Sequence, residues 1–398
     1  MLAVLCGVAT SQTLPGQVIN NQVQVGDIFS QGELNIVTVE EGVDSSTTAT
    51  GNSVQAYSDQ ADMAVTSNQT LVGSVVGQTV VNVTGSLGED SYVSTAAIGN
   101  TADIGANQST VTGVVTQIST FSPEVTARTQ IEGETAQAGN VNAGALAMAN
   151  NVNLGLTNGS AGVRVNQTNG ADVLADGGAV LQYVSGTSSI TGVAVGNNIS
   201  SVGDTSSAAR LAFGQTNDGG LVQASQFTAY GNAQTAVTST TAVGNAVSAY
   251  NEGPLLDVTN YQANNAYVRS QSEGSAYLFG SGSAIAYGAG NSAIAGNTGA
   301  EVVLDNTQWN GAGGVEVIAT FTGNEGYDGY AQATAVGNDV TGYACSDCTG
   351  SMTINNNQTN NGDVSARSGV TVNNGRSVTG VSNATGNSAV FYVTRPQQ

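Results

Sequence analysis

Residues 235–245 read Thr-Ala-Val-Thr-Ser-Thr-Thr-Ala-Val-Gly-Asn, and this stretch contains the pattern that decides the fold. A run of small and β-branched residues ends in a Gly-Asn step, and the arrangement recurs along the whole chain. The asparagines of the step are Asn52, Asn100, Asn140, Asn197, Asn245, Asn291, Asn338 and Asn387. The preceding glycines are separated by 48, 40, 57, 48, 46, 47 and 49 residues. The chain is therefore a repeat protein.

A second motif repeats with the same period. It is a glutamine box, usually Asn-x-Gln or Asn-Gln followed by Thr and Asn. Its glutamines are Gln22, Gln69, Gln108, Gln167, Gln215, Gln262, Gln308 and Gln358. Seven intervals lie between the first and the last, so the mean period, (358 − 22)/7, is about 48 residues and falls in the range of known repeat architectures. The glutamine follows the Gly-Asn step by 18 to 21 residues in most repeats, but by 9 and 28 in the second and third.

The local pattern within a repeat is that of β-strands. In residues 315–321, Val-Glu-Val-Ile-Ala-Thr-Phe, apolar side chains alternate with their neighbours, which is the strand period of two. Val, Thr and Ile favour strands, whereas Gly, Asn and Ser mark turns. The sequence predicts an all-β protein without long helices.

Forty-eight residues fit either two coils of a parallel β-solenoid, of about 24 residues each, or one blade of a β-propeller. A propeller blade needs bulky aromatic wedges, and this chain has 1 Trp and 7 Phe. A thin solenoid needs only small apolar residues, with Asn and Gln stacked as ladders of side-chain amides. We therefore expect a parallel β-solenoid of about eight repeats with two coils each, about 75–80 Å long, with the propeller as the alternative. The Gln and Asn residues of both motifs are the predicted ladder.

The chain divides by composition into four parts. Residues 1–13 resemble an export signal, because an apolar run ends in Gly7-Val8-Ala9 before a polar stretch. Residues 14–50 are expected to form an N-terminal cap and first coil, residues 51–385 the repeat solenoid, and residues 386–398 a C-terminal cap. Whether Cys6 carries a lipid stays open. Past the signal-like stretch, no apolar run is long enough to span a bilayer.

Charge excludes several function classes. The chain has 7 basic and 28 acidic residues, a net charge of −21, and no histidine. Nucleic-acid binding requires clustered Lys and Arg, which are lacking. Histidine-based catalysis is impossible, and no carboxylate pair stands out as an acid and base. We expect no enzyme activity, no cofactor and no metal.

Two smaller features are candidates for specific roles. Cys345 and Cys348 form a Cys-x-x-Cys without a second ligand pair, so in an exported chain they predict a small disulfide. Aromatic residues gather in the second half of the chain, and Trp309, Tyr327 and Tyr330 are a possible contact face for sugar rings or another protein. The alternative is that these rings fill wider coils or cover strand edges.

The Gly-Asn and Gln-Thr-Asn boxes, the Val/Thr/Ala strands between them, the lack of Lys and His and the export-like start resemble curli-related bacterial surface anchors. The similarity is to the holdfast anchor protein D family of stalked alphaproteobacteria, over roughly residues 14 to 393. It implies a non-enzymatic cell-surface anchor or adhesin, exported and outer-membrane-associated. Its implied partners are adhesive polysaccharide, a curlin-like subunit and other envelope proteins. The alternative is a secreted β-helical fibre that binds or degrades polysaccharide.

Overall fold

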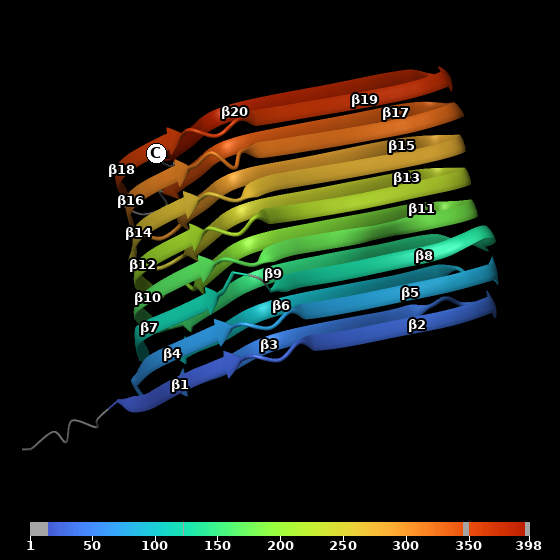
Figure 1. Cartoon of the computed structure of the whole chain (residues 1–398). Helices are drawn as coiled ribbons and strands as arrows, with labels where there is room; N and C mark the ends of the chain where they lie inside the picture. Colours follow the sequence, from blue (N-terminus) through green and yellow to red (C-terminus); the bar gives the residue numbers. More distant parts are fainter. Residues whose placement is uncertain (1–14, 122, 345–349, 395–398) are drawn as a thin grey trace, which may run out of the picture.

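The computed structural model describes residues 15–121, 123–344 and 350–394. Their regular secondary structure consists entirely of β-strands, stacked in parallel from the N-terminal to the C-terminal end of the molecule (Figure 1). The signal-like segment with Cys6, and the Cys345–Cys348 pair, lie outside the described residues. The protein is a parallel β-solenoid.

Each coil consists of three stretches of chain. In the first coil they are β1 (Gly16–Gln24), β2 (Ile28–Thr38) and β3 (Asp44–Asp59). The next two coils repeat this order with β4 (Met63–Leu71), β5 (Val75–Ser86), β6 (Asp90–Asn107), β7 (Thr110–Ser119), β8 (Glu124–Ala138) and β9 (Asn140–Thr157).

In the fourth to seventh coils, the second and third stretches join into one long strand. The coils are then β10 (Ser160–Asn169) with β11 (Asp172–Gly203), β12 (Ala208–Asn217) with β13 (Leu221–Asn251), β14 (Leu255–Asn264) with β15 (Tyr267–Asn297), and β16 (Glu301–Asn310) with β17 (Val315–Ala344). The last coil separates them again, as β18 (Ser351–Asn360), β19 (Val364–Asn374) and β20 (Ser377–Val393).

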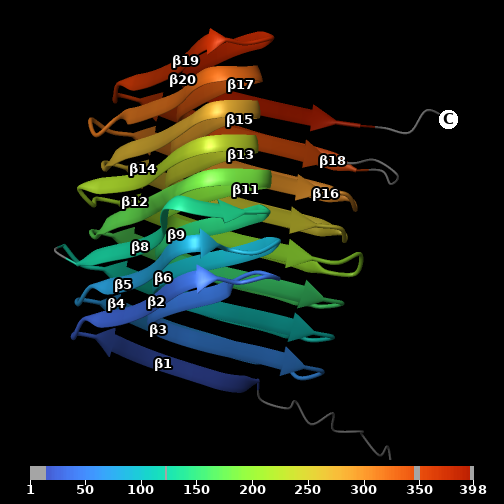
Figure 2. The same ribbon diagram turned by 90° about the vertical axis from the view of Figure 1, so that its right-hand side faces the viewer.

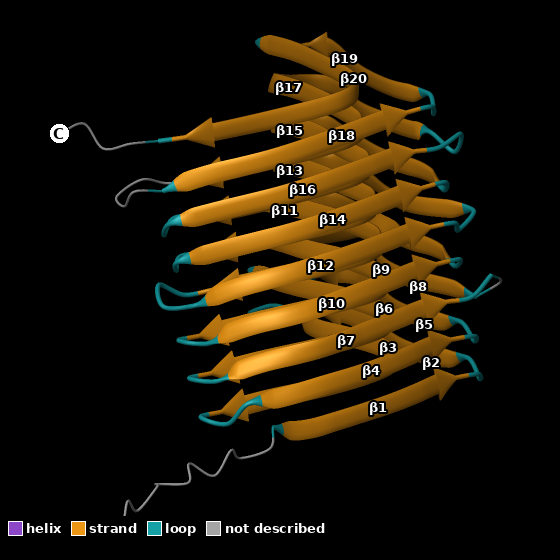
Figure 3. Ribbon diagram, turned by 90° about the vertical axis from the view of Figure 1, so that its left-hand side faces the viewer, coloured by secondary structure: helices purple, strands orange, loops and turns teal. Residues whose placement is uncertain are grey.

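The first stretches form one eight-stranded parallel sheet, β1-β4-β7-β10-β12-β14-β16-β18, which faces the viewer in Figure 3. The second and third stretches form the other sheet, seen from the opposite side in Figure 2. Each strand pairs with its equivalent one repeat later, as Gln22 does with Gln69 and Gln262 with Gln308.

This register corrects the predicted number of coils. Each repeat is one coil, not two, because hydrogen-bonded neighbours lie one full repeat apart. The prediction of two coils assumed short strands. In the structure one coil contains three long stretches: β3 alone has 16 residues, and β11, which joins the second and third stretches, has 32. Eight coils are separated by seven steps of about 4.8 Å, so the stack is about 34 Å high rather than the predicted 75–80 Å. Stacked coils with two separate ends also exclude the propeller.

The chain runs out along the first two stretches and back along the third, so the coil is two layers thick. Gln22 of β1 donates from its Nε2 to the backbone oxygen of Ser53 in β3, 2.8 Å away. Thr95 of β6 donates to the Oγ1 of Thr79 in β5 at 2.7 Å. These contacts place the first stretch against the second half of the third stretch, and the second stretch against its first half.

The core between the layers is thin and made mainly of Val and Ala. One apolar cluster lies between the second stretch and the first half of the third, and includes Val81, Ala97 and Phe321. Another lies between the first stretch and the second half of the third, and includes Val65 and Ile104. Small side chains suffice because the layers are held by amide ladders as well as by apolar packing.

Candidate functional site

The predicted glutamine ladder runs through the interior of the solenoid. In each coil after the first, the glutamine Nε2 donates to the Oε1 of the glutamine one coil earlier, at 2.7–2.9 Å. The same Nε2 also donates to a backbone oxygen of the third stretch, for example Gln69 to Thr101 at 2.9 Å. The members are Gln22, Gln69, Gln117, Gln167, Gln215, Gln262, Gln308 and Gln358.

Gln108 is not a member of this ladder, and the prediction of that residue is wrong. It lies exposed in the turn between β6 and β7, with a φ of 49°. Its place is taken by Gln117, whose offset from Gly99 (117 − 99 = 18) is the one found in most other repeats. The sequence Asn-Gln-Ser-Thr around Gln108 resembles the glutamine box, but it lies in a turn.

An asparagine ladder lies beside the glutamines, where the third stretch bends. In every coil but the last, the Nδ2 donates to the Oδ1 of the asparagine in the next coil at 2.7–2.8 Å. Its members are Asn52, Asn100, Asn150, Asn197, Asn245, Asn291, Asn338 and Asn387.

Asn140 is the second correction. It stands exposed at the start of β9 and donates to Asp90 Oδ1 at 2.9 Å, while Asn150 takes the ladder position. In most coils a glycine precedes the ladder asparagine, and at Gly244 the space for a side chain is taken. A Cβ on Gly244 would lie 2.3 Å from Asn264 Oδ1 and 2.5 Å from the backbone oxygen of Gly290. The third coil has Ala149 there, which is why the Gly-Asn motif missed it.

Sequence reasoning missed a third ladder, at the end of the first stretch. Its asparagines stack at 2.8–2.9 Å and are Asn169, Asn217, Asn264, Asn310 and Asn360. The signal was present in the asparagine two residues after the ladder glutamine, but only the glutamine was assigned a structural role. All three ladders point inward and bond along the stack, so binding to a partner falls to the outer surface.

The structure does not bring Trp309, Tyr327 and Tyr330 together on one face. Trp309 is half-buried in β16 of the first sheet. Tyr327 is 62% exposed at the far corner of the coil, with the Arg376 guanidinium 5.4 Å from its ring centre. Tyr330 begins the return half of β17 and donates its hydroxyl to Gln332. The outward half of β17 separates Trp309 from the two tyrosines.

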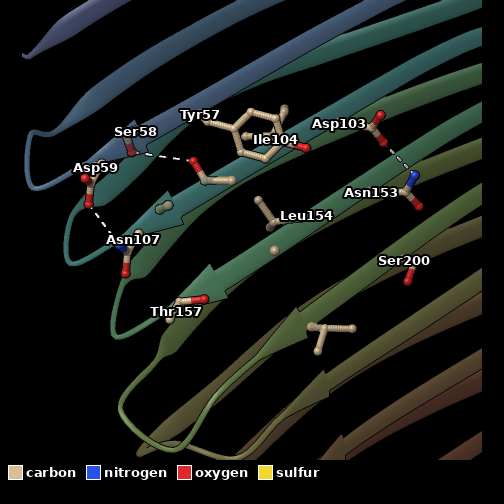
Figure 4. A pocket seen from close by; sticks show the side chains of 14 residues that line it. Tyr57, Ser58, Asp59, Asp103, Ile104, Asn107, Asn153, Leu154, Thr157 and Ser200 are labelled. Atoms are coloured by element: carbon tan, nitrogen blue, oxygen red, sulfur yellow. Dashed lines mark hydrogen bonds between the residues drawn. The ribbon is translucent and has the colours of Figure 1, made fainter.

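A different aromatic row runs along the outside of the third stretch. We define the tyrosine column as the equivalent outward positions Tyr57, Gly105, Gly155, Val202, Tyr250, Gly296, Tyr343 and Tyr392. The rings of Tyr343 and Tyr392 stack at 5.6 Å, and those of Tyr250 and Tyr343 lie 6.2 Å apart across Gly296. Between Tyr57 and Val202 the column is open, and a groove lies there (Figure 4).

Two side chains with shifted pKa values, Tyr267 and Asp204, take part in hydrogen bonds that stabilise the solenoid. Burial, together with a hydrogen bond to Glu316, raises the pKa of Tyr267 to about 12. The pKa of Asp204 is lowered because the Ser207 hydroxyl and the Asn158 amide donate to its carboxylate. Within the described residues, no three His, Cys, Asp or Glu side chains come together as a metal site. No helix in that part of the chain could span a membrane.

The family model for holdfast attachment protein D matches residues 37–314. The chain belongs to the holdfast attachment protein D family. A relative of that name from Caulobacter vibrioides is 49% identical over 69 residues, which is 17% of this chain and 23% of the relative. The aligned segment thus spans less than a quarter of that holdfast attachment protein. No solved structure matches the chain.

Proposed function

We propose that the protein is a non-enzymatic anchor at the cell surface that holds the adhesive polysaccharide of a holdfast, or a curlin-like partner, at the outer membrane. The family match supports a role in holdfast attachment. The observation that carries the anchoring mechanism is the tyrosine column. It places rings at equivalent outer positions of four coils, on a solenoid whose interior is fixed by ladders.

Such a surface suits retention better than turnover. Several weak contacts along one rigid face act together, because each later contact forms at high effective concentration. The net charge of −21 opposes non-specific self-association of the exported chain. Export and outer-membrane association agree with the signal-like segment at residues 1–13.

Deletion of the protein in its own cells tests this function. We expect adhesive polymer to be synthesised in normal amount but released into the medium, and to be retained again when the intact chain is supplied. Surface protease treatment of whole cells should degrade the protein in the complemented strain. If cells without the protein hold their polymer as firmly as before, it is not the anchor.

The competing function is a secreted fibre that degrades polysaccharide. Incubation of the purified chain with exopolysaccharide separates the two, because a degrading enzyme shortens the polymer, whereas an anchor retains it uncut.

A further inference from the structure

The open part of the tyrosine column is a groove of about 550 Å³ on the outer face of the first four coils (Figure 4). β3, β6, β9 and the return half of β11 contribute to it. A volume of this size is typical of sites for small ligands or for a segment of a chain.

The floor of the groove is built from glycines beside one exposed ring. Tyr57 is 69% exposed, and its ring lies over Gly105, where a Cβ would come within 2.4 Å of the ring. Gly155, one coil further, has no heavy atom within 4 Å of where its Cβ would stand. Tyr57 therefore presents an aromatic wall next to an open glycine floor that ends at Val202.

Polar pairs border the floor on both sides. On one side Asn153 donates to Asp103 Oδ1 at 2.7 Å, and on the other Asn107 donates to Asp59 Oδ1 at 2.8 Å. These bonds orient the side chains, while the second carboxylate oxygen of each pair has lone pairs available to a ligand. The described lining residues include two carboxylates and no basic side chain.

The backbone beneath the floor of the groove offers no pairing partners to a peptide strand. The strands β6, β9 and β11 are paired in parallel on both sides, so their N–H and C=O groups bond along the stack, and β3, the edge strand of the first coil, is paired with β6 on one side. A docking peptide would find no free backbone partners on the face of the sheet. A ligand here must instead be recognised by ring stacking and by side-chain hydrogen bonds.

A sugar chain meets these conditions. Pyranose rings have apolar faces that stack on tyrosine, and their hydroxyls donate to carboxylate and amide oxygens. The coil spacing of about 4.8 Å is close to the length of one sugar unit in an extended chain. Polar pairs on successive coils can therefore follow successive sugars.

We propose that this groove, between Tyr57 and Val202 with its floor at Gly155, binds a segment of a polysaccharide that carries no acidic groups. The choice of a glycan agrees with the proposed function and rests on it. The exclusion of acidic sugars rests on Asp59 and Asp103, whose charges would repel uronates and attract amines.

The test uses the purified full-length chain and three hexasaccharides measured by isothermal titration calorimetry: neutral cellohexaose, cationic chitosan hexamer and anionic oligogalacturonate. We expect the first two to bind and the third not to. A Cβ at Gly155 has no heavy atom within 4 Å, so Gly155→Leu adds its side chain to the open floor of the groove. It should weaken binding about tenfold or more while leaving the circular dichroism spectrum unchanged. Tyr57→Ala should have a similar effect.

Matched controls keep the result specific. Gly144→Leu changes the same strand at a position where the nearest atom to a Cβ is 3.9 Å away, outside the groove. Tyr92→Ala removes another ring that is 56% exposed on the same sheet. Both should bind as the unsubstituted chain does. Asp103→Asn should weaken the chitosan hexamer several-fold more than cellohexaose, because only the former carries charge.

Four outcomes would overturn the proposal. The first three are binding of none of the hexamers below about 10 mM, equal effects of Gly155→Leu and Gly144→Leu, and preference for oligogalacturonate. If Gly155→Leu changes only the sedimentation coefficient, the occupant is a second copy of the chain, and the sugar site is also rejected. Failure here is distinct from failure of the anchor function. If cells shed polymer when the protein is deleted but retain it when the Gly155→Leu variant is supplied, the anchor function is supported and the role of this groove is rejected.

Discussion

Replacement of Gln215 by leucine is the sharpest test of the ladder. Gln215 is fully buried in the fifth coil. Its Oε1 accepts from Gln262 Nε2 at 2.8 Å, and its Nε2 donates to Gln167 Oε1 at 2.9 Å and to the backbone oxygen of Ala246 at 3.0 Å. Leucine fills a similar volume but makes none of these bonds.

The expected cost follows from the groups left behind. Three buried polar atoms lose a partner, and each such loss costs about 1–3 kcal/mol. Since penalties within one network are not additive, we expect Gln215→Leu to lower the free energy of unfolding by about 3–6 kcal/mol. Gln358→Leu in the last coil removes a partner from Gln308 Oε1, from the Ser388 backbone oxygen and, through a long bond, from Asn356 Nδ2; because Gln358 itself is partly exposed, the change should cost less, about 1–2 kcal/mol.

Guanidinium unfolding followed by circular dichroism measures both effects, and hydrogen exchange locates them. Gln108→Leu is the matched control, because this glutamine lies exposed in a turn and is expected to change stability by less than about 0.5 kcal/mol. Amides of the coils around Gln215 should lose protection first, since stability in a solenoid is a sum over neighbouring coils. Equal midpoints for Gln215→Leu and Gln108→Leu would refute the ladder as a source of stability.

Deletion of one coil, acidification and replacement of the tyrosines each test another part of the structure. Deletion of residues 244–289 joins Val243 to Gly290 and brings Asn197 next to Asn291 in the ladder. We expect a shorter, soluble solenoid whose circular dichroism spectrum is still that of a β-protein, because each coil contacts only its neighbours. A globally unfolded product would contradict that reasoning. The pKa of Asp204 in the folded chain lies below its ordinary value of 3.8, so the carboxylate stabilises the fold fully above pH 3.8 and this stabilisation is lost as the pH falls through the folded pKa. The difference in stability between the unsubstituted chain and Asp204→Asn should therefore shrink below about pH 4. A difference that grows on acidification would contradict this prediction. Joint replacement of Tyr250, Tyr343 and Tyr392 by Ser should release more polymer from cells than the same replacement of Trp309, Tyr327 and Tyr330. The reason is that only the first three rings belong to the tyrosine column. If the second variant releases more polymer, the contact surface lies on the other faces.

The interior was predictable from sequence because its constraints repeat. A ladder amide must bond to the same group one coil away, so its spacing stays close to the length of one repeat, and Gln215, Gln262 and Gln308 follow from that rule. Gln108 was chosen by its neighbours in sequence rather than by its offset from Gly99. The offset that most other repeats share would have selected Gln117 instead.

The number of coils per repeat could not be read from the period alone. A period fixes how often a contact recurs, but not how the chain is arranged between recurrences. The deciding quantity is strand length: the stretch before Gly51 continues through the bend to Asp59, because the asparagine at the bend is satisfied by the backbone oxygen of Thr70 across the core. That long-range partner is invisible to a local pattern.

The outer surface was the least predictable part, and the reason is physical. Inward positions are tied to the coils above and below, so one residue type persists along a whole ladder. Outward positions face solvent and change from coil to coil, as Tyr57, Gly105 and Val202 do within one column. Only the inward positions are constrained by the repeat, and the groove lies at outward positions, where the residue type is free to differ from coil to coil. A solenoid of this kind can therefore vary its contact surface coil by coil without altering the ladders that hold it together.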